Sequence, residues 1–216
     1  KYNFDEVIEA PGNRLGEDDA VSERWGRSDL LPMWVADMDF RTPPFVIEAI
    51  RRRLDHEVLG YTSLAKLGNI HYQWQKERHG WNVTREMADV YAGYCAWIGF
   101  ALQCFTAPGD KVMVSASCLS SFFLVTEHNH REVVYSPLLL KDGQYQIDFE
   151  RFRADVKGCK MLILITHNPG GRVWTREELA EIAEICFDNQ VLVISDEIHA
   201  DLTLPGYTHP TFALYR

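Results

Sequence analysis

The sequence has little clustered positive charge and no long apolar run. It carries 22 Lys and Arg residues against 31 Asp and Glu, a formal net charge of −9, and its densest basic group is residues 51–53. Nucleic acids and anionic membranes select clustered positive charge. A membrane-spanning helix needs roughly 20 consecutive apolar residues, and no run comes close. We therefore expect neither nucleic acid nor a membrane as a partner.

Cysteine and histidine are present, but they lack the spacing of a metal site. None of the five cysteines stands in a Cys-x-x-Cys pair, and Cys104 and Cys186 fall on apolar helix faces, where cysteine acts as a small hydrophobic residue. His128 and His130 lie in a polar segment that is more typical of an exposed loop than of a zinc site. The first residues do not resemble a signal peptide. We expect reduced thiols, a cytoplasmic location and no metal.

The second half of the chain has the pattern of an α/β protein. From residue 91 onward, short apolar strands alternate with helical segments, which is typical of a mostly parallel sheet covered by helices. We expect strands near 91, at 111–117 and 131–136, and beginning at 160 and 191. The expected helices are 96–105, 119–127, 148–153 and 175–186.

The first half is less regular. Residues 1–30 are polar and predict an irregular arm. The prolines at 43 and 44 predict the start of a helix that continues to about Leu54, because proline is tolerated in the first turn. Its expected buried face is Val46, Ile47, Ile50 and Leu54. A further helix is expected to end near Arg78, before Gly80.

Two strand ends carry the most informative side chains. Asp196 follows the apolar run 191–194, and Asn168 follows the apolar strand that begins at 160 and precedes a proline, which favours the end of a strand. Between them, Thr175 and Glu178 have the spacing of a capping box at the start of a helix. A strand, a helix and a strand in this order place both strand ends at the same sheet edge, where α/β proteins bind ligands. A surface or helix-capping role for Asp196 is the alternative.

Gly93 precedes the helix that is expected after Tyr94. Helix N-termini bind phosphate through free backbone N–H groups and the helix dipole. A turn glycine is an equally good interpretation of Gly93 by itself. Trp34 and Tyr61 are by themselves interpreted as ordinary, partly buried aromatic residues.

Six motifs in order resemble the fold-type I pyridoxal phosphate enzymes, in the cystathionine β-lyase or cysteine-conjugate β-lyase branch of the class I and II aminotransferases. The histidine of the last motif, in place of a tyrosine, favours the lyase branch. The motifs are Leu-Pro-Met-Trp-Val-Ala-Asp-Met-Asp-Phe at 31–40, Gly-Tyr-Thr at 60–62, Arg-His-Gly-Trp at 78–81, Phe-Thr-Ala-Pro-Gly-Asp-Lys-Val at 105–112, His-Asn-Pro-Gly-Gly-Arg-Val-Trp at 167–174 and Ser-Asp-Glu-Ile-His at 195–199.

The resemblance implies a three-layer α/β sandwich with a mostly parallel central sheet. Residues 1–45 would form an N-terminal arm and a segment of the small domain, and residues 46–216 part of the large, cofactor-binding domain. It also implies a homodimer that acts on a small amino-acid substrate. The implied cofactor contacts are Asp196 with the pyridinium nitrogen, Asn168 with the ring hydroxyl, the backbone of Tyr94 and Cys95 with the phosphate, Tyr61 with the phosphate of the neighbouring subunit, and His199 behind Asp196. Trp34 and Asp37 would line the substrate side.

The sequence departs from the family pattern at three places. The Schiff-base lysine of the family lies downstream of the Asp-Glu-Ile-His motif, and no lysine follows Lys160, so the catalytic lysine is not assigned and the chain resembles an N-terminal portion. Leu119 stands where the family places an aromatic ring against the cofactor; losing such stacking costs on the order of 1 kcal/mol. Ile165 stands where the family has the first asparagine of Asn-Pro-His-Asn-Pro.

Three functions therefore stay open. The first is β-elimination on a sulfur amino acid, cystathionine or a cysteine conjugate, to pyruvate, ammonia and a thiol. The second is transfer of an amino group to a keto acid. The third is a non-catalytic homologue that binds a ligand or partner, which the missing lysine and Leu119 favour.

Overall fold

A computed structural model describes residues 2–8, 18–27, 29–30, 38, 40–60, 65–91, 93–115, 120–166 and 170–215. The chain forms two compact units, Lys1–Ser63 and Leu64–Arg216, each considered by itself. The division expected at residues 45 and 46 concerns the domains of a complete enzyme and stays a prediction. No helix in the described part of the chain is both long enough and apolar enough to cross a membrane.

The first unit contains α1 (Asp18–Trp25) and α2 (Pro44–Leu54). The expectation of an irregular arm over residues 1–30 was wrong at α1, whereas α2 begins at the predicted proline. The expected buried face of α2 was wrong. Val46 and Ile47 are half-buried, whereas Ile50 and Leu54 are 52% and 55% exposed. An apolar helix face is buried only where another element packs over it, and the described part of this unit leaves these two side chains open.

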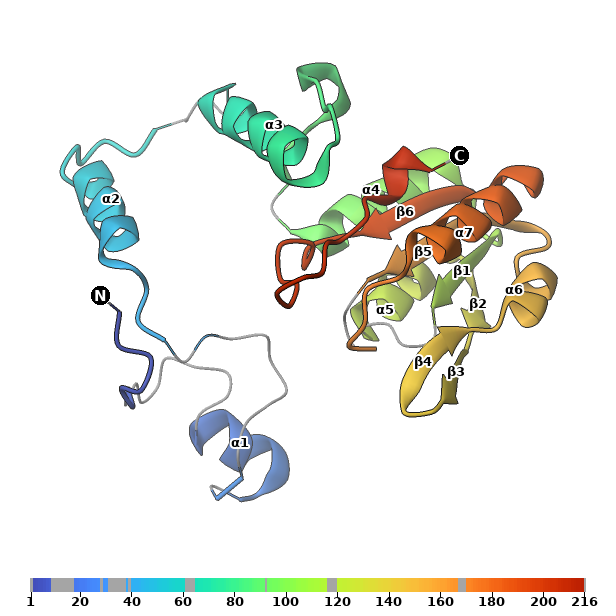
Figure 1. The fold of residues 1–216 in the computed structure, drawn as a ribbon, viewed down its shortest axis with the longest axis horizontal. Coiled ribbons are helices and arrows are strands. Elements are labelled where there is room, and N and C mark those ends of the chain that lie inside the picture. The colour runs from blue at the N-terminus through green and yellow to red at the C-terminus, as the bar shows by residue number, and fades with distance from the viewer. Residues whose placement is uncertain are drawn as a thin grey trace. The chain divides into compact units, whose positions relative to one another are not determined.

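The second unit is built on a parallel sheet of four strands in the order β2-β1-β5-β6 (Figure 1). The strands are β1 (Lys111–Ser115), β2 (Glu132–Ser136), β5 (Cys159–Ile165) and β6 (Leu192–Asp196). Every neighbouring pair is parallel. The helices of this unit are α3 (Ala65–His79), α4 (Tyr94–Phe105), α5 (Ser120–His128), α6 (Phe149–Asp155) and α7 (Arg176–Asp188), with short 3₁₀ turns η1 (Arg85–Met87) and η2 (Phe212–Leu214). The α/β class with a mostly parallel sheet is confirmed.

The sheet has a separate apolar core on each face, as a sheet buried on both sides requires. On one face, Ile98 and Leu102 of α4 and Phe122 of α5 pack on the strands. On the other, α6 and α7 pack through a second set of buried residues that includes Phe152, Leu179, Ile182, Leu162 and Leu164. The two helical layers and the sheet form the expected three-layer sandwich.

Three local expectations need correction. Residues 138–147 form an antiparallel hairpin, β3 (Leu138–Lys141) and β4 (Gln144–Ile147), of which only the turn was predicted. Asp142 and Gly143 both have positive φ, as a tight two-residue turn requires. The short strand expected at Tyr91 does not form, because that segment pairs with no described strand. Cys104 is exposed, because it lies on the side of α4 that faces away from the sheet.

The predicted capping box of α7 is confirmed. The Thr175 hydroxyl accepts from the Glu178 amide at 3.2 Å, and the Glu178 carboxylate accepts from the Thr175 amide at 2.7 Å. These bonds satisfy two amides that a helix start leaves without partners. They fix the start of the helix that joins β5 to β6.

Arg131 anchors the other end of α4. It is 8% exposed, and its guanidinium donates to the carbonyl oxygens of Leu102, Thr106 and Asn129 and to the Thr106 hydroxyl. The last carbonyls of a helix have no partners within it, and the planar guanidinium can reach several of them at once. A charge that would be costly to bury is thereby satisfied, and α4, α5 and β2 are joined.

We predict that Arg131→Met lowers the free energy of unfolding by about 3 kcal/mol, because buried carbonyls left without donors cost about 1–3 kcal/mol each. Urea unfolding followed by tryptophan fluorescence measures the loss. Arg151→Met is the matched control: its side chain is 56% exposed beside Asp155, and exposed pairs contribute less than about 1 kcal/mol. Equal losses in the two variants would contradict the anchoring role.

Candidate functional site

The carboxyl ends of β1, β5 and β6 form one edge of the sheet. Because the strands are parallel and in register, Ile165 at the end of β5 is paired with Asp196 at the end of β6. The amide of Thr166 also donates to the Asp196 carbonyl at 3.4 Å. This is the edge at which α/β proteins hold ligands.

Two helix N-termini point to the same edge. The helix α4 runs antiparallel to β1, to which the tight turn at residues 106–110 connects it, so its first residue lies at the strands' carboxyl ends (Figure 1). The helix α5 begins at Ser120, soon after β1 ends. The Tyr94 and Ser121 hydroxyls are 2.8 Å apart and join the two N-termini.

The N-terminus of α4 keeps its backbone donors available. Gly93 at the N-cap has no side chain to cap them, and its φ of 128° is a conformation that other residues rarely adopt. Free amides and the positive end of the helix dipole attract anions. The positive φ explains why a glycine stands at this position. From the sequence alone, a phosphate-binding helix start and an ordinary turn were equally good interpretations of Gly93.

Asp196 lies close to this N-terminus. It is half-buried, and one carboxylate oxygen accepts from the Ile198 amide at 3.1 Å. The hydrogen bond to Ser121 lowers the pKa of the Tyr94 hydroxyl, but burial, Cys95 and the negative charge of Asp196 together raise it above its usual value. The structure therefore brings Tyr94, Cys95 and Asp196 to one edge, as an anion-binding helix start beside a carboxylate.

Of the other predicted site residues, the structure describes only His199. His199 is half-buried in the turn that follows β6, and its role behind Asp196 stays a prediction. Five positions lie outside the described residues, so their predicted roles stay predictions too: Trp34, Asp37, Tyr61, Leu119 and Asn168.

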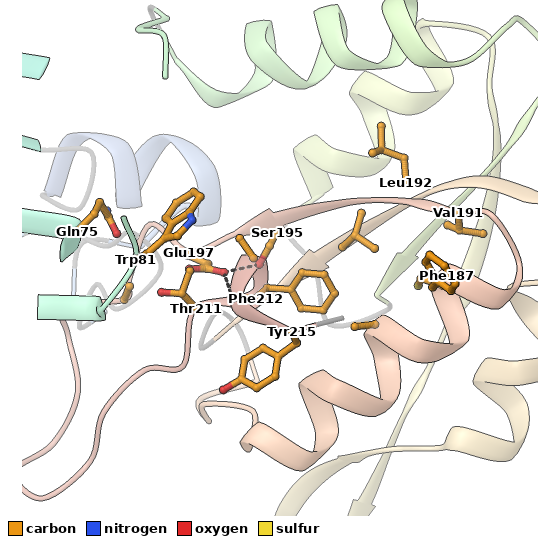
Figure 2. A pocket seen from close by; sticks show the side chains of 15 residues that line it. Gln75, Trp81, Phe187, Val191, Leu192, Ser195, Glu197, Thr211, Phe212 and Tyr215 are labelled. Atoms are coloured by element: carbon orange, nitrogen blue, oxygen red, sulfur yellow. Dashed lines mark hydrogen bonds between the residues drawn. The ribbon is translucent and has the colours of Figure 1, made fainter. Parts of the chain in front are cut away.

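Glu197 was not among the predicted site residues, yet its carboxylate has several polar contacts at this edge. Successive side chains of a strand point to opposite faces, so Glu197 and Ser195 lie on the α7 face while Asp196 lies on the α4 face. One oxygen of Glu197 accepts from the Ser195 hydroxyl and from the Phe212 amide, both at 2.8 Å (Figure 2).

His209 and Thr166 extend this network. The His209 side chain is fully buried, its Nδ1 lies 3.9 Å from the second oxygen of Glu197, and its Nε2 lies 2.8 Å from the Thr166 hydroxyl. Thr166 comes directly after β5. The spacing of Ser195 and Glu197 could have been read from the sequence, but 43 residues separate Thr166 from His209, and no local pattern signals that contact.

A second carboxylate ties α3 to the turn after β6. Asp201 accepts from the Trp74 indole at 2.9 Å and lies 3.1 Å from Nε2 of His79. The Arg78 guanidinium covers the Trp74 ring at 4.6 Å. The motif at residues 78–81 therefore contributes to a contact that fixes the chain just beyond Asp196.

A cavity beside β6 lies away from the predicted cofactor edge. It measures about 980 Å³ and lies on the α7 face of β6, between Gln75, Trp81, Phe187 and Phe212 (Figure 2). Ser195 and Glu197 line it, whereas Asp196 does not. Asp196 and the α4 N-terminus place a carboxylate beside an anion-binding helix start, so this edge is the better candidate for the chemistry.

The model of the family described as aminotransferase class I and II matches residues 28–211. The chain belongs to this family. Among curated proteins, the cystathionine β-lyase PatB of Bacillus subtilis (strain 168) is 41% identical over 98% of this chain and 56% of its own length. The protein MalY of Escherichia coli (strain K12) is 30% identical over 96% of this chain and 55% of its own length.

Solved structures of the same kind are also similar. Cystalysin from Treponema denticola, which contains a pyridoxal 5′-phosphate cofactor, superposes with a TM-score of 0.90 at 34% identity and covers 98% of this chain and 55% of its own. The pyridoxal phosphate-bound C–S lyase from Staphylococcus hominis superposes with a TM-score of 0.88 at 36% identity, with the same coverage. The chain thus spans about half the length of the proteins it matches.

The buried environment of Glu197 makes stability depend on pH. Burial raises its pKa above the usual 4.5, and the negative charge of Asp196 adds to this, although the bonds from Phe212 and Ser195 and a protonated His79 oppose it. The folded state therefore binds this proton more tightly than the unfolded state. The stabilisation is complete below about pH 4.5 and is lost as pH rises through the raised pKa.

We predict that wild type loses stability relative to Glu197→Gln as pH rises from about 4.5 to neutrality, because Gln cannot titrate. Urea unfolding across this range measures the difference. Glu177→Gln is the control: hydrogen bonds to its own amide and to Thr175 lower the pKa of Glu177, so its stability difference changes only below about pH 4.5. A flat difference for the Glu197 variant would be evidence against the raised pKa.

Proposed function

We propose that the protein is a pyridoxal 5′-phosphate-dependent carbon–sulfur lyase. It would convert a sulfur amino acid, such as cystathionine or a cysteine conjugate, with water to pyruvate, ammonia and a thiol. The observation that carries the proposal is the position of Asp196 beside the uncapped N-terminus of α4. The likeness to cystathionine β-lyase and C–S lyase proteins supports it.

The described residues fit the two charged parts of this cofactor. Its phosphate is an anion, and the amides at the start of α4 are anion donors that no side chain caps. Its ring nitrogen, when protonated, is a cation, and Asp196 offers a half-buried carboxylate. When bound, the cofactor supplies an electron sink for the carbanion that forms when the substrate loses its α-proton.

Each residue then has a distinct task. The Asp196 carboxylate keeps the proton on the ring nitrogen, since a nearby negative charge favours the cationic form. The Tyr94 and Cys95 amides orient the phosphate, and the bond from Tyr94 to Ser121 holds the two helix starts together. From the family pattern, Asn168 would form a hydrogen bond to the ring hydroxyl, and His199 would support Asp196.

Further residues are proposed from the family pattern. Trp34 and Asp37 would line the substrate side, and Tyr61 would reach the phosphate in the neighbouring subunit of a homodimer. The printed sequence has no lysine after Lys160. We therefore propose that the lysine that bonds to the cofactor belongs to the half of the relatives' length that this chain does not span.

Two other functions have specific support. The family description favours an aminotransferase, which would return the amino group to a keto acid. Leu119, in place of an aromatic ring, favours a homologue that binds its ligand without catalysis. Products separate the first two: pyruvate released without an added keto acid indicates the lyase, and transamination that requires one indicates the aminotransferase.

Cofactor binding tests the site. We predict that the full-length protein binds pyridoxal phosphate and that Asp196→Asn weakens binding at least about tenfold, because a neutral amide cannot pair with the protonated ring. Titration followed by absorbance measures the dissociation constant. Borohydride reduction and peptide mapping should then place the cofactor on a lysine beyond residue 216.

The matched control is Asp188→Asn, which removes the same charge from an exposed position at the end of α7. It should bind as wild type does. A full-length wild-type protein that forms no reduced adduct would contradict the enzyme and leave the non-catalytic homologue. Equal weakening in both aspartate variants would contradict the role of Asp196.

A further inference from the structure

Glu197 and Asp196 are neighbouring carboxylates on opposite faces of one strand end. Asp196 faces α4, on the side of the sheet where Ile194 packs with Ile98 and Leu102. Glu197 faces α7 and η2, on the side where Val193 and Phe212 pack. The α7 face of the sheet is called the rear face below. Contacts that hold the Glu197 side chain on this rear face also hold the backbone from which the Asp196 side chain projects.

Glu197 is held from three directions. The Ser195 hydroxyl, near the end of β6, donates a hydrogen bond to one oxygen of Glu197, and the Phe212 amide at the start of η2 donates to the same oxygen. His209, fully buried, lies at its second oxygen and bonds to Thr166 at the end of β5. The groups joined in this way come from β5, β6 and the segment 209–212, which are far apart in the sequence.

The network closes on Asp196 itself. The amide of Thr166 donates to the Asp196 carbonyl, and the Thr166 hydroxyl is bonded to His209. Hydrogen bonds therefore run from the Asp196 carbonyl through Thr166 to His209. His209 Nδ1 then lies 3.9 Å from the Glu197 carboxylate, at the outer limit of an ion pair, and the peptide bond leads back to Asp196. These contacts restrict the backbone at the end of the strand, which would otherwise be free to fray.

We propose that Glu197 is a positioning residue for Asp196: from the rear face of β6 it holds the strand end against Thr166, His209 and Phe212, so that the Asp196 carboxylate meets the cofactor ring in a fixed place. This rests on the proposed function, since it needs a cofactor at Asp196. A binding site held about 1 Å too loosely fails even when all of its residues are present.

The test compares cofactor binding in full-length variants. Glu197→Ala removes the acceptor and should raise the dissociation constant for pyridoxal phosphate about tenfold or more, whereas Glu197→Gln keeps an acceptor oxygen for Phe212 and Ser195 and should stay within about threefold of wild type. Glu184→Ala, at an exposed position of α7, is the control and should match wild type. Circular dichroism sets a temperature at which every variant is folded.

Near-normal cofactor binding in Glu197→Gln, beside weak binding in Glu197→Ala, would show that the acceptor oxygen matters and not the negative charge of Glu197. If Glu197→Ala does not fold, Thr166→Val decides, because it removes one hydroxyl and keeps the branched shape. Its dissociation constant should rise about threefold or more.

The remaining outcomes overturn the inference. Binding at wild-type strength in Glu197→Ala or, where that variant does not fold, in Thr166→Val would show that the network does not position Asp196. Equal weakening in the Ala and Gln variants would show that the acceptor oxygen is not what matters. If wild type itself does not bind the cofactor, the proposed function fails and the inference fails with it; if wild type binds and the variants do not differ, the inference alone fails.

Discussion

The parallel pairing of β5 with β6 is the constraint on which the rest of the site depends. Its register places Ile165 opposite Asp196, so both strands end at the same level. The backbone of a buried strand must find its hydrogen-bond partners in its neighbours, and this fixes the register firmly. A shift by one residue would turn Asp196 to the α7 face and Glu197 to the α4 face, because side chains alternate along a strand.

The two carboxylates at the end of β6, Asp196 and Glu197, lie on opposite faces of the sheet and have different surroundings. On the α4 face, a carboxylate meets the positive ends of helix dipoles, which is an arrangement for a ligand with an anionic part and a cationic part. On the α7 face, the second carboxylate accepts bonds from Ser195 and Phe212 and lies beside His209. Asp196 therefore faces the side that is open to a ligand, whereas Glu197 makes its contacts within the protein.

Anchors away from this edge keep its parts in place. Arg131 holds the far end of α4, so the helix start at Gly93 is set by a buried contact at the opposite end of the same helix. Asp201 ties α3 to the turn beyond β6 through Trp74 and His79. A rigid helix transmits position along its length, so the contact of Arg131 with the last turn of α4 also affects where the amides of its first turn lie.

The sequence by itself determined the four strands of the parallel sheet, the capping box of α7 and the position of Asp196 at a strand end, because these follow from short-range patterns: apolar runs, helix spacing and a polar residue at a strand end. It also determined the family, through motifs that keep their order. Only the tertiary structure decided that Ile50 and Leu54 lie exposed in their unit, that residues 138–147 pair as a hairpin and that Glu197 joins His209, Thr166 and Phe212. Those outcomes depend on contacts between segments that are distant in the sequence, and the free energy of such contacts cannot be inferred from a local sequence pattern.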